Sequence, residues 1–281
     1  DGSFYSAYNI AVAMEWVAAN HPEVDALNLS LGSFDLFTAL CDNIYTWTQA
    51  YSQAVANLRA NGTVVTVSAG NDGSGTEMSA PACIEDAMAT GAVYDFSGSF
   101  SSSTCNDPAA APDEPACFSN SNVHTDLFAP GSRITSSALG GGLETYSGTS
   151  QAAPHVAACA LLLRNRNPAL GTGQVEQLLV ISPTQVTDPT NDLTFPRLDC
   201  YHAMLQTSIT CEAGPRTLSG PVTYTGMETH RSTTTLATSG AVTIGNGAAI
   251  TFDAASGITL DYGFRVQAGG RFVGRIGPVD C

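Results

Sequence analysis

Apolar residues in the first two thirds of this chain recur at helical spacing in some stretches and form short β-branched runs in others. The first pattern is typical of helices that pack one face on a core, and the second of buried strands in a parallel sheet. Their alternation predicts an α/β domain with a doubly wound, mostly parallel sheet and helices on both faces. The expected helices cover residues 5–20, 44–60 and 174–181, and the expected strands residues 24–31, 63–68 and 88–93.

The helix expected within residues 146–163 is apolar on nearly every side, which predicts burial inside the domain. The turn-prone segment 147–149 precedes it and delivers Ser150 to the first helical turn. Thr149 or Ser150 can cap the amides exposed there. A hydroxyl at this place feels the positive end of the helix, which suits a group that faces a developing anion. Taken by itself, the pattern is better explained by an ordinary capped and buried helix.

Helical periodicity disappears in residues 212–281, where Thr and Gly become frequent. Apolar–polar–apolar triplets starting at Val242, Ile250, Ile258, Phe264 and Phe272 recur at spacings of 8, 8, 6 and 8 residues. Such spacing predicts short strands stacked as a small solenoid or a sandwich. We therefore expect one domain over residues 1–211 and a small all-β module over 212–281. A stability or secretion module is its expected role, and a spacer, a sorting element and a weak carbohydrate or surface binder are the alternatives.

Charge is sparse and acidic: the 281 residues carry a formal net charge of −15, and all ten basic residues are Arg. Residues 1–211 hold 20 acids against 5 Arg, whereas residues 212–281 hold 5 of each. Because phosphate binding needs clustered cations, a nucleic-acid partner is disfavoured. No apolar run reaches bilayer length, so no membrane partner is expected either, and oligomeric state is left open.

Eight cysteines without a CxxC pair argue against a zinc site and for disulfides formed in an oxidising, extracellular compartment. Cys105 and Cys117 flank a loop rich in Pro, Asp and Ala, which makes them the first expected pair. The other expectations are a Cys41–Cys83 pair, a Cys211–Cys281 staple around the C-terminal module, and a free buried thiol at Cys159.

Four short motifs follow one another in a fixed order along residues 1–210. Residues 148–155 read GTSQAAPH, and upstream of them lie NLSLG at 28–32, VVTVSAGN at 64–71, and FSN and FAPG at 118–120 and 128–131. The first motif resembles the segment around the nucleophile of the subtilisin-like serine proteases, and the others resemble that family's motifs in the same order. The resemblance implies the subtilisin-like fold, incomplete at its N-terminus, and a polypeptide substrate.

By this resemblance Ser150 is the nucleophile, and Asn71 donates its side-chain amide to the oxyanion beside the backbone N–H of Ser150. A turn Asn before Asp72-Gly73 is the alternative interpretation of Asn71. Two strand edges are implied to hold an extended peptide through main-chain hydrogen bonds and to wall its first pocket. The implied substrate-binding residues are Ser30, Leu31 and Gly32 on one edge, Ser68, Ala69 and Gly70 on the other, Ser79 at the pocket floor, and Ser3 and Tyr5 in an outer loop.

The base and its orienting acid are missing, because the family's D-[ST]-G and H-G-T-H motifs do not occur in this chain. His155 lies five residues beyond Ser150 and, at about 100° per residue, points roughly 140° away around the helix. We expect the other histidines to be surface or packed residues, and the catalytic Asp and His to lie upstream, beyond this portion of a longer protease. These expectations concern His21, His124, His202 and His230.

Two functions remain open. The first is a secreted serine endopeptidase whose N-terminal part is not included, the chain alone being inactive. The second is a degenerate scaffold that binds peptides or proteins without cleaving them. An α/β-hydrolase is excluded because G-x-S-x-G is absent around Ser150. No cofactor is required by this chemistry; calcium is common in the family, but no acidic loop here has ligand spacing.

Overall fold

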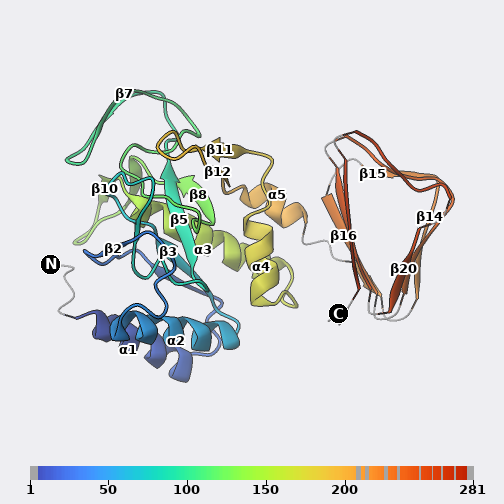
Figure 1. Ribbon diagram of the computed structural model, residues 1–281, viewed down its shortest axis with the longest axis horizontal. Helices are drawn as coiled ribbons and strands as arrows, with labels where there is room; N and C mark the ends of the chain where they lie inside the picture. Colours follow the sequence, from blue (N-terminus) through green and yellow to red (C-terminus); the bar gives the residue numbers. More distant parts are fainter. Residues whose placement is uncertain are drawn as a thin grey trace. The chain divides into compact units, whose positions relative to one another are not determined.

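The computed structural model describes residues 6–206, 210–212, 215–224, 227–232, 235–246, 248–254, 256–260, 262–268 and 270–276. The chain divides into two compact units, Asp1–His202 and Ala203–Cys281 (Figure 1). This division falls N-terminal to the expected boundary after residue 211.

Four parallel strands form the central sheet of the first unit. They are β1 (Ala26–Leu29), β3 (Val64–Ser68), β5 (Met88–Val93) and β8 (Leu127–Pro130), side by side in that order. All five residues of β3 and all six of β5 are buried, as the β-branched runs predict. Strand β1 pairs only with β3 within the described chain, so it forms one edge of the sheet. The doubly wound α/β prediction is confirmed.

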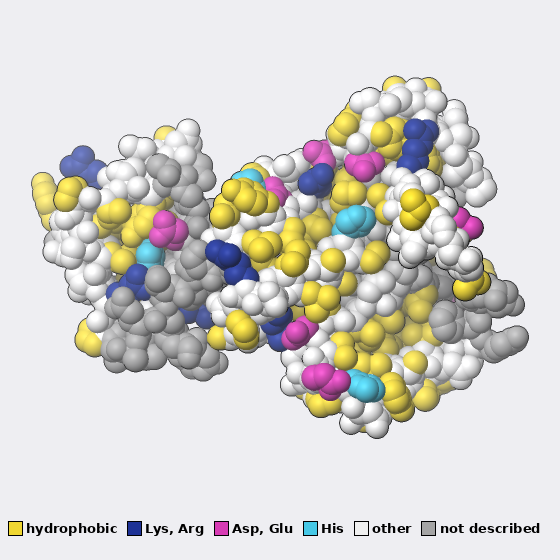
Figure 2. Space-filling model, turned by 180° about the vertical axis from the view of Figure 1, so that it is seen from behind, with side chains coloured by type: hydrophobic (Ala, Val, Ile, Leu, Met, Phe, Trp, Pro, Cys, Tyr) yellow, Lys and Arg dark blue, Asp and Glu magenta, His cyan; other side chains and the backbone are white. Residues whose placement is uncertain are grey.

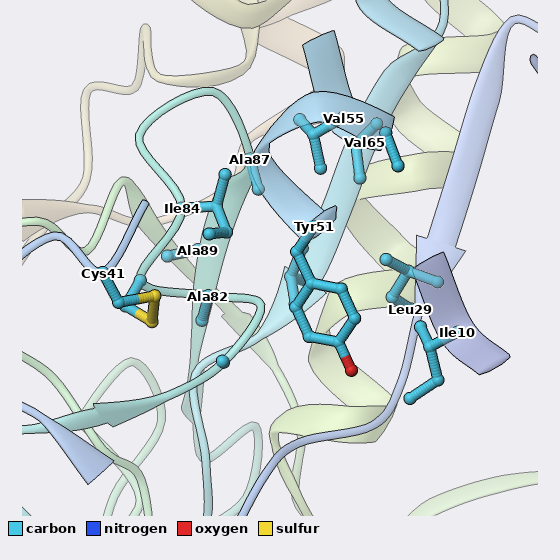
Figure 3. Close-up of a cluster of buried hydrophobic side chains, with 14 of the residues drawn as sticks. Ile10, Leu29, Cys41, Tyr51, Val55, Val65, Ala82, Ile84, Ala87 and Ala89 are labelled. Carbon is cyan, nitrogen blue, oxygen red and sulfur yellow. A yellow bond between two sulfur atoms is a disulfide. The ribbon is translucent and has the colours of Figure 1, made fainter. Parts of the chain in front are cut away.

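Helices α1 (Ala7–Asn20) and α2 (Thr46–Ala60) cover one face of this sheet. The Ser6 side chain caps α1 by accepting a hydrogen bond from the N–H of Tyr8. Because side chains alternate along a strand, Val65 and Val67 point to the same face and join a cluster with both helices (Figure 3). Ile10, Tyr51 and Val55 come from the helices into this cluster.

Helix α3 (Thr149–Arg166) packs against all four sheet strands, and α4 (Thr172–Leu179) follows it; α5 (Cys200–Leu205) ends the described helices. The predicted burial of α3 within the domain is confirmed for its sheet-facing side but does not extend to its other side. Leu161 and Leu162 are 46% and 49% exposed and line an open hollow of about 710 Å³ with Asp25 and Pro168. No described element covers this side of α3, so Leu161 and Leu162 remain in contact with solvent. None of the helices within the described ranges is long and apolar enough to cross a bilayer.

Short antiparallel strand pairs lie outside the central sheet. They are β2 (Leu36–Phe37) with β4 (Met78–Ser79), β6 (Gly98–Ser101) with β7 (Asn106–Ala110), β9 (Ile134–Ser137) with β10 (Leu143–Tyr146), and β11 (Gln185–Thr187) with β12 (Thr194–Pro196).

Three disulfides tie this region together. Cys41–Cys83 and Cys105–Cys117 are confirmed as expected. The expected free thiol at Cys159 is wrong, because that residue, buried on α3, is bonded to Cys200 at the start of α5. Separation along the chain is not the reason, since the confirmed Cys41–Cys83 pair is 42 residues apart; the apolar helical context of Cys159 favoured a buried free thiol instead. The expected Cys211–Cys281 staple lies outside the residues whose side chains are described.

The C-terminal unit is a parallel β-solenoid, which decides between the two predicted architectures. Its three sheets run β13-β16-β19-β22, β14-β17-β20 and β15-β18-β21. The first coil takes 20 residues, because Val222 lies beside Val242, and later coils take 22, because Ile250 lies beside Phe272. The triplet spacings of 8, 8 and 6 residues are the three sides of a 22-residue coil. The strands are Thr210–Glu212, Arg216–Ser219, Val222–Tyr224, Met227–Ser232, Thr235–Ser239, Val242–Ile244, Ala249–Ala254, Gly257–Thr259, Arg265–Val266 and Arg271–Ile276, in order β13 to β22.

A histidine is buried in the solenoid core. His230 is 4% exposed, and its ring lies 5.5 Å from that of Tyr224 and 5.7 Å from that of Phe252. Its Nε2 is 3.4 Å from the Glu228 carboxylate but outside hydrogen-bonding geometry, and neither ring nitrogen has a hydrogen-bond partner among the described residues. Burial, with a smaller contribution from Arg216, lowers the pKa of His230 to about 4.

We expect the solenoid to lose stability in acid and His230→Phe to reduce that loss. Because the folded pKa is depressed, the unfolded chain takes up the proton first, and the penalty grows as the pH falls from about 6.5 to about 4. Its full size is about 3 kcal/mol. Urea unfolding of wild type and variant in parallel, between about pH 7 and pH 4, measures the difference; an identical pH dependence of the two would contradict it.

Candidate functional site

The predicted nucleophile and oxyanion residue meet at the carboxyl edge of the sheet, where loops of parallel sheets collect ligands. Ser30 follows β1, Asn71 follows β3 after Gly70, and Ser150 lies in the first turn of α3. Ser30 Oγ donates a hydrogen bond of 2.6 Å to the carbonyl of Ser150, and Ser150 Oγ lies 3.5 Å from the carbonyl of Ser30. The end of β1 is therefore held against the start of α3.

Asn71 caps α3 in place of the Thr or Ser cap that the sequence predicts. The N-cap residue is Gly148, which has no side chain to contribute. The Asn71 Oδ1 atom accepts hydrogen bonds from Thr149 N at 2.8 Å and from Thr149 Oγ1 at 3.1 Å. An amide whose oxygen is fixed in this way has its orientation set, because its nitrogen must point elsewhere.

Two N–H donors are left unused at this helix start. Neither Asn71 Nδ2 nor the backbone N–H of Ser150 has an acceptor within the described part of the chain. Asn71 is exposed and Ser150 is half-buried, so solvent or a ligand reaches both. Donors beside the positive end of a helix are suited to an anion that forms during acyl transfer.

The two expected substrate edges differ from each other. Ala69 and Gly70 use their backbone N–H and C=O groups internally, bonding Thr90, Ser79, Asn120 and Thr149. Their main-chain groups already have partners within the domain, and peptide binding by strand addition at this edge stays a prediction. Ser30 and Gly32 are exposed, whereas Ser68 and Ala69 are buried. The 30–32 segment is thus the edge open to an extended ligand.

Ser79 lies between the two edges, as the expected pocket floor requires. It is buried, and its N–H donates to the Ala69 carbonyl at 3.0 Å. A Cβ on Gly32 would stand 2.5 Å from Ser79 Oγ, so any larger residue there would require the Ser79 side chain to shift. Leu31 is half-buried, and its carbonyl accepts a 3.0 Å hydrogen bond from Ser68 Oγ. Ser3 and Tyr5, the weakest members of the predicted set, lie outside the described residues.

No histidine in the described ranges contacts Ser150. His155 hydrogen-bonds the carbonyl of Gln151 in its own helix, at 2.8 Å from Nδ1. His202 pairs with Asp199 at 2.6 Å, the arrangement of a base and its orienter. However, the Cys159–Cys200 disulfide anchors that pair nine residues along α3 from Ser150, about 13 Å by helical rise. The His202–Asp199 pair cannot serve this serine.

A second hollow, of about 280 Å³, lies at the opposite, amino edge of the sheet. Burial raises the pKa of Asp126 to about 7, and it also raises the pKa of the neighbouring Glu176. The Arg59 guanidinium lies among these acids, bonding Glu176 and, at 3.2 Å, Asp86. This built-in cation balances part of the charge. Among the described residues no three His, Cys, Asp or Glu side chains are grouped as metal ligands.

Sequence reasoning missed the roles of two residues around Asn71. Thr149 was considered only as a cap, although its hydroxyl bridges the Asn71 side chain and the Gly70 backbone. Asn120 was noted only within the FSN motif, although it is fully buried and contacts the Asn71 turn. The sequence signal for both was their place inside a matched motif.

Hydrophobic side chains gather over one face of the larger unit, where acidic and basic groups are few and scattered (Figure 2). That face therefore presents few charged groups to a ligand.

Comparison with known proteins agrees with this geometry. The profile of the subtilase family matches residues 1–196. Alkaline serine exoprotease A of Vibrio alginolyticus is 31% identical over 185 residues, which are 65% of this chain and 29% of that protein. Alkaline elastase YaB of Bacillus sp. (strain YaB) is 29% identical over 185 residues, 66% of this chain and 41% of that one.

Solved structures agree as well. A cold-adapted subtilisin-like serine proteinase superposes with a TM-score of 0.53 and 28% identity, covering 70% of this chain and 62% of the other. The prenylagaramide maturation protease PagA gives a TM-score of 0.57 and 25% identity, covering 73% and 69%. The part of the chain that aligns with the Vibrio and Bacillus proteases spans less than half of the length of either. On the family profile, the shared fold and the motif geometry together, this chain belongs to the subtilase family of serine proteases.

Proposed function

We propose that this chain is the nucleophile-bearing part of a secreted serine endopeptidase. The observation that carries the proposal is the contact between the Asn71 side chain and the first turn of α3, with Oδ1 2.8 Å from Thr149 N. With its oxygen anchored there, the Asn71 side chain is proposed to turn its Nδ2 donor toward the same anion as the backbone N–H of Ser150. The two donors are the partners that an oxyanion formed at Ser150 needs.

In the proposed reaction, a base takes the proton of Ser150 Oγ as that oxygen attacks the carbonyl carbon of a peptide bond. The carbonyl oxygen becomes an anion and faces Ser150 N–H and Asn71 Nδ2. The C–N bond breaks, the base gives its proton to the leaving amine, and water hydrolyses the acyl-enzyme. Residues 30–32 hold the substrate chain on the acyl side, while Ser68, Ala69, Gly70 and Ser79 wall its first pocket.

The base and its orienting Asp are proposed to come from a segment upstream of this chain. Two features support this: β1 has an open edge beside Ser150, and α3 leaves Leu161 and Leu162 exposed on an uncovered side. A strand and a helix added there would continue the parallel sheet and bury those leucines. The three disulfides support folding in an oxidising, extracellular compartment.

The alternative is a scaffold that binds peptides without cleaving them, favoured by the lack of a described histidine near Ser150. A fluorophosphonate probe distinguishes the two. The 281-residue chain alone is expected to stay unlabelled, and the chain joined to its upstream segment is expected to be labelled at Ser150. Labelling of the chain alone would reveal a base within it, and no labelling of the joined protein would favour the scaffold.

The solenoid is proposed to act as a stability or secretion module. It contributes none of the residues assigned to the reaction. Its role is separable from that of the peptidase portion, because it forms a compact unit with its own buried core.

A further inference from the structure

The turn that carries Asn71 is held from behind by one buried side chain. Asn120 is 0% exposed, and its Oδ1 accepts hydrogen bonds from the N–H groups of Asp72 at 2.8 Å and Ser74 at 3.0 Å. Its Nδ2 donates to Asp72 Oδ2 at 2.9 Å, and its own N–H donates to the Gly70 carbonyl at 3.0 Å. Asn120 is therefore hydrogen-bonded to the chain on both sides of Asn71.

The fit behind this turn is tight. Gly70 has φ +119°, a conformation that favours glycine, and a Cβ there would stand 2.3 Å from Asn120 Nδ2. The turn has two further braces: Thr104 Oγ1 donates to the Asn71 carbonyl at 3.1 Å, and Gly73 N–H donates to the Phe118 carbonyl at 2.8 Å. Asn120, Thr104 and Phe118 make no hydrogen bond to the Asn71 side chain itself.

From this network we infer that Asn120 is a positioning residue for the proposed peptidase, which sets the place of the Asn71 amide by fixing residues 70–74. This inference rests on the proposed function of Asn71. A donor that drifts by about 1 Å loses much of its stabilisation of the transition state, and such misplacement costs up to about 10²-fold in rate. Both polar side-chain atoms of Asn120 bond the turn, and its complete burial keeps it out of reach of a substrate.

The test is Asn120→Ala in the protease that contains this chain, followed by kcat and KM on a peptide substrate. We expect kcat to fall by about 10- to 100-fold, with KM nearly unchanged, because Asn71 acts on the transition state. The matched control is Asn122→Ala. Asn122 is as deeply buried, but it bonds His124 N and the Phe37 carbonyl instead of the turn.

Two further variants separate positioning from general damage. In an Asn71→Ala background, Asn120→Ala should cost less than about twofold in kcat, because its effect passes through the missing amide. Asn120→Asp should lose activity, since it brings a second carboxylate to Asp72 Oδ2. Combining it with Asp72→Asn restores a donor and an acceptor at that contact and should recover kcat.

Hydrogen exchange gives a reading independent of activity. In the 281-residue chain, Asn120→Ala should speed exchange of the Asp72 and Ser74 amides, while Asn122→Ala should not. Unchanged exchange, additive losses with Asn71→Ala, or equal kcat losses at Asn120 and Asn122 would each overturn the inference. If instead Asn71→Ala itself leaves kcat intact, the proposed role of Asn71 is what fails.

Discussion

Ser150→Ala in the complete protease is expected to lower kcat by about 10⁶-fold while leaving substrate binding nearly unchanged. The size is carried over from a subtilisin in which the nucleophile was replaced. The physical reason is that the other hydroxyl at the start of α3, Thr149 Oγ1, is fully buried and already bonded to Asn71 Oδ1 and the Gly70 backbone. Steady-state kinetics on a peptide substrate, with active-site titration to count competent molecules, measures the loss.

The control for that experiment is Ser147→Ala. Ser147 lies three residues earlier and accepts a 2.8 Å hydrogen bond from the N–H of Arg133, so its loss affects only the β9–β10 hairpin. We expect the control to keep kcat within about twofold, as exposed substitutions usually do. Activity that survives Ser150→Ala would place the nucleophile elsewhere in the protein.

Much of the fold follows from the sequence because its signals are local. The periodicity of residues 44–60 and the β-branched run at 63–68 depend on side chains close together in the chain, and both elements form within two residues of the expected bounds. The solenoid likewise follows from a repeated triplet. The sequence does not distinguish a solenoid from a sandwich, because a triplet predicts a strand but not how successive strands stack.

The failures concern long-range partners. The apolar helical context of Cys159 favoured a free thiol and gave no sign of its partner Cys200. Leu161 and Leu162 are exposed because no described element packs on that side of α3. The cap of α3 comes from Asn71, which lies 78 residues before Thr149. The resemblance pointed to Asn71, yet nothing in composition or periodicity could show that its oxygen is used for the cap. That double use permits a test that separates capping from catalysis.

Asn71→Ala removes both the cap oxygen and the amide donor. Loss of the donor is expected to lower kcat by about 10²–10³-fold, a magnitude known from an oxyanion-hole asparagine in a subtilisin. Loss of the cap is expected to lower the free energy of unfolding by about 1 kcal/mol. Alanine alone therefore cannot tell an oxyanion donor from a helix cap, because both properties fall together.

Asn71→Asp keeps the cap and removes only the donor. Its carboxylate can still accept the 2.8 Å hydrogen bond from Thr149 N, and the negative charge is favourable at the start of a helix. The same charge would face the forming oxyanion in place of an N–H. We therefore expect stability at or above wild type and kcat reduced at least as far as in Asn71→Ala, measured by urea unfolding and steady-state kinetics. If Asn71→Asp instead retained wild-type kcat, Asn71 would be a cap and turn residue, and the proposed oxyanion site would lose its side-chain donor.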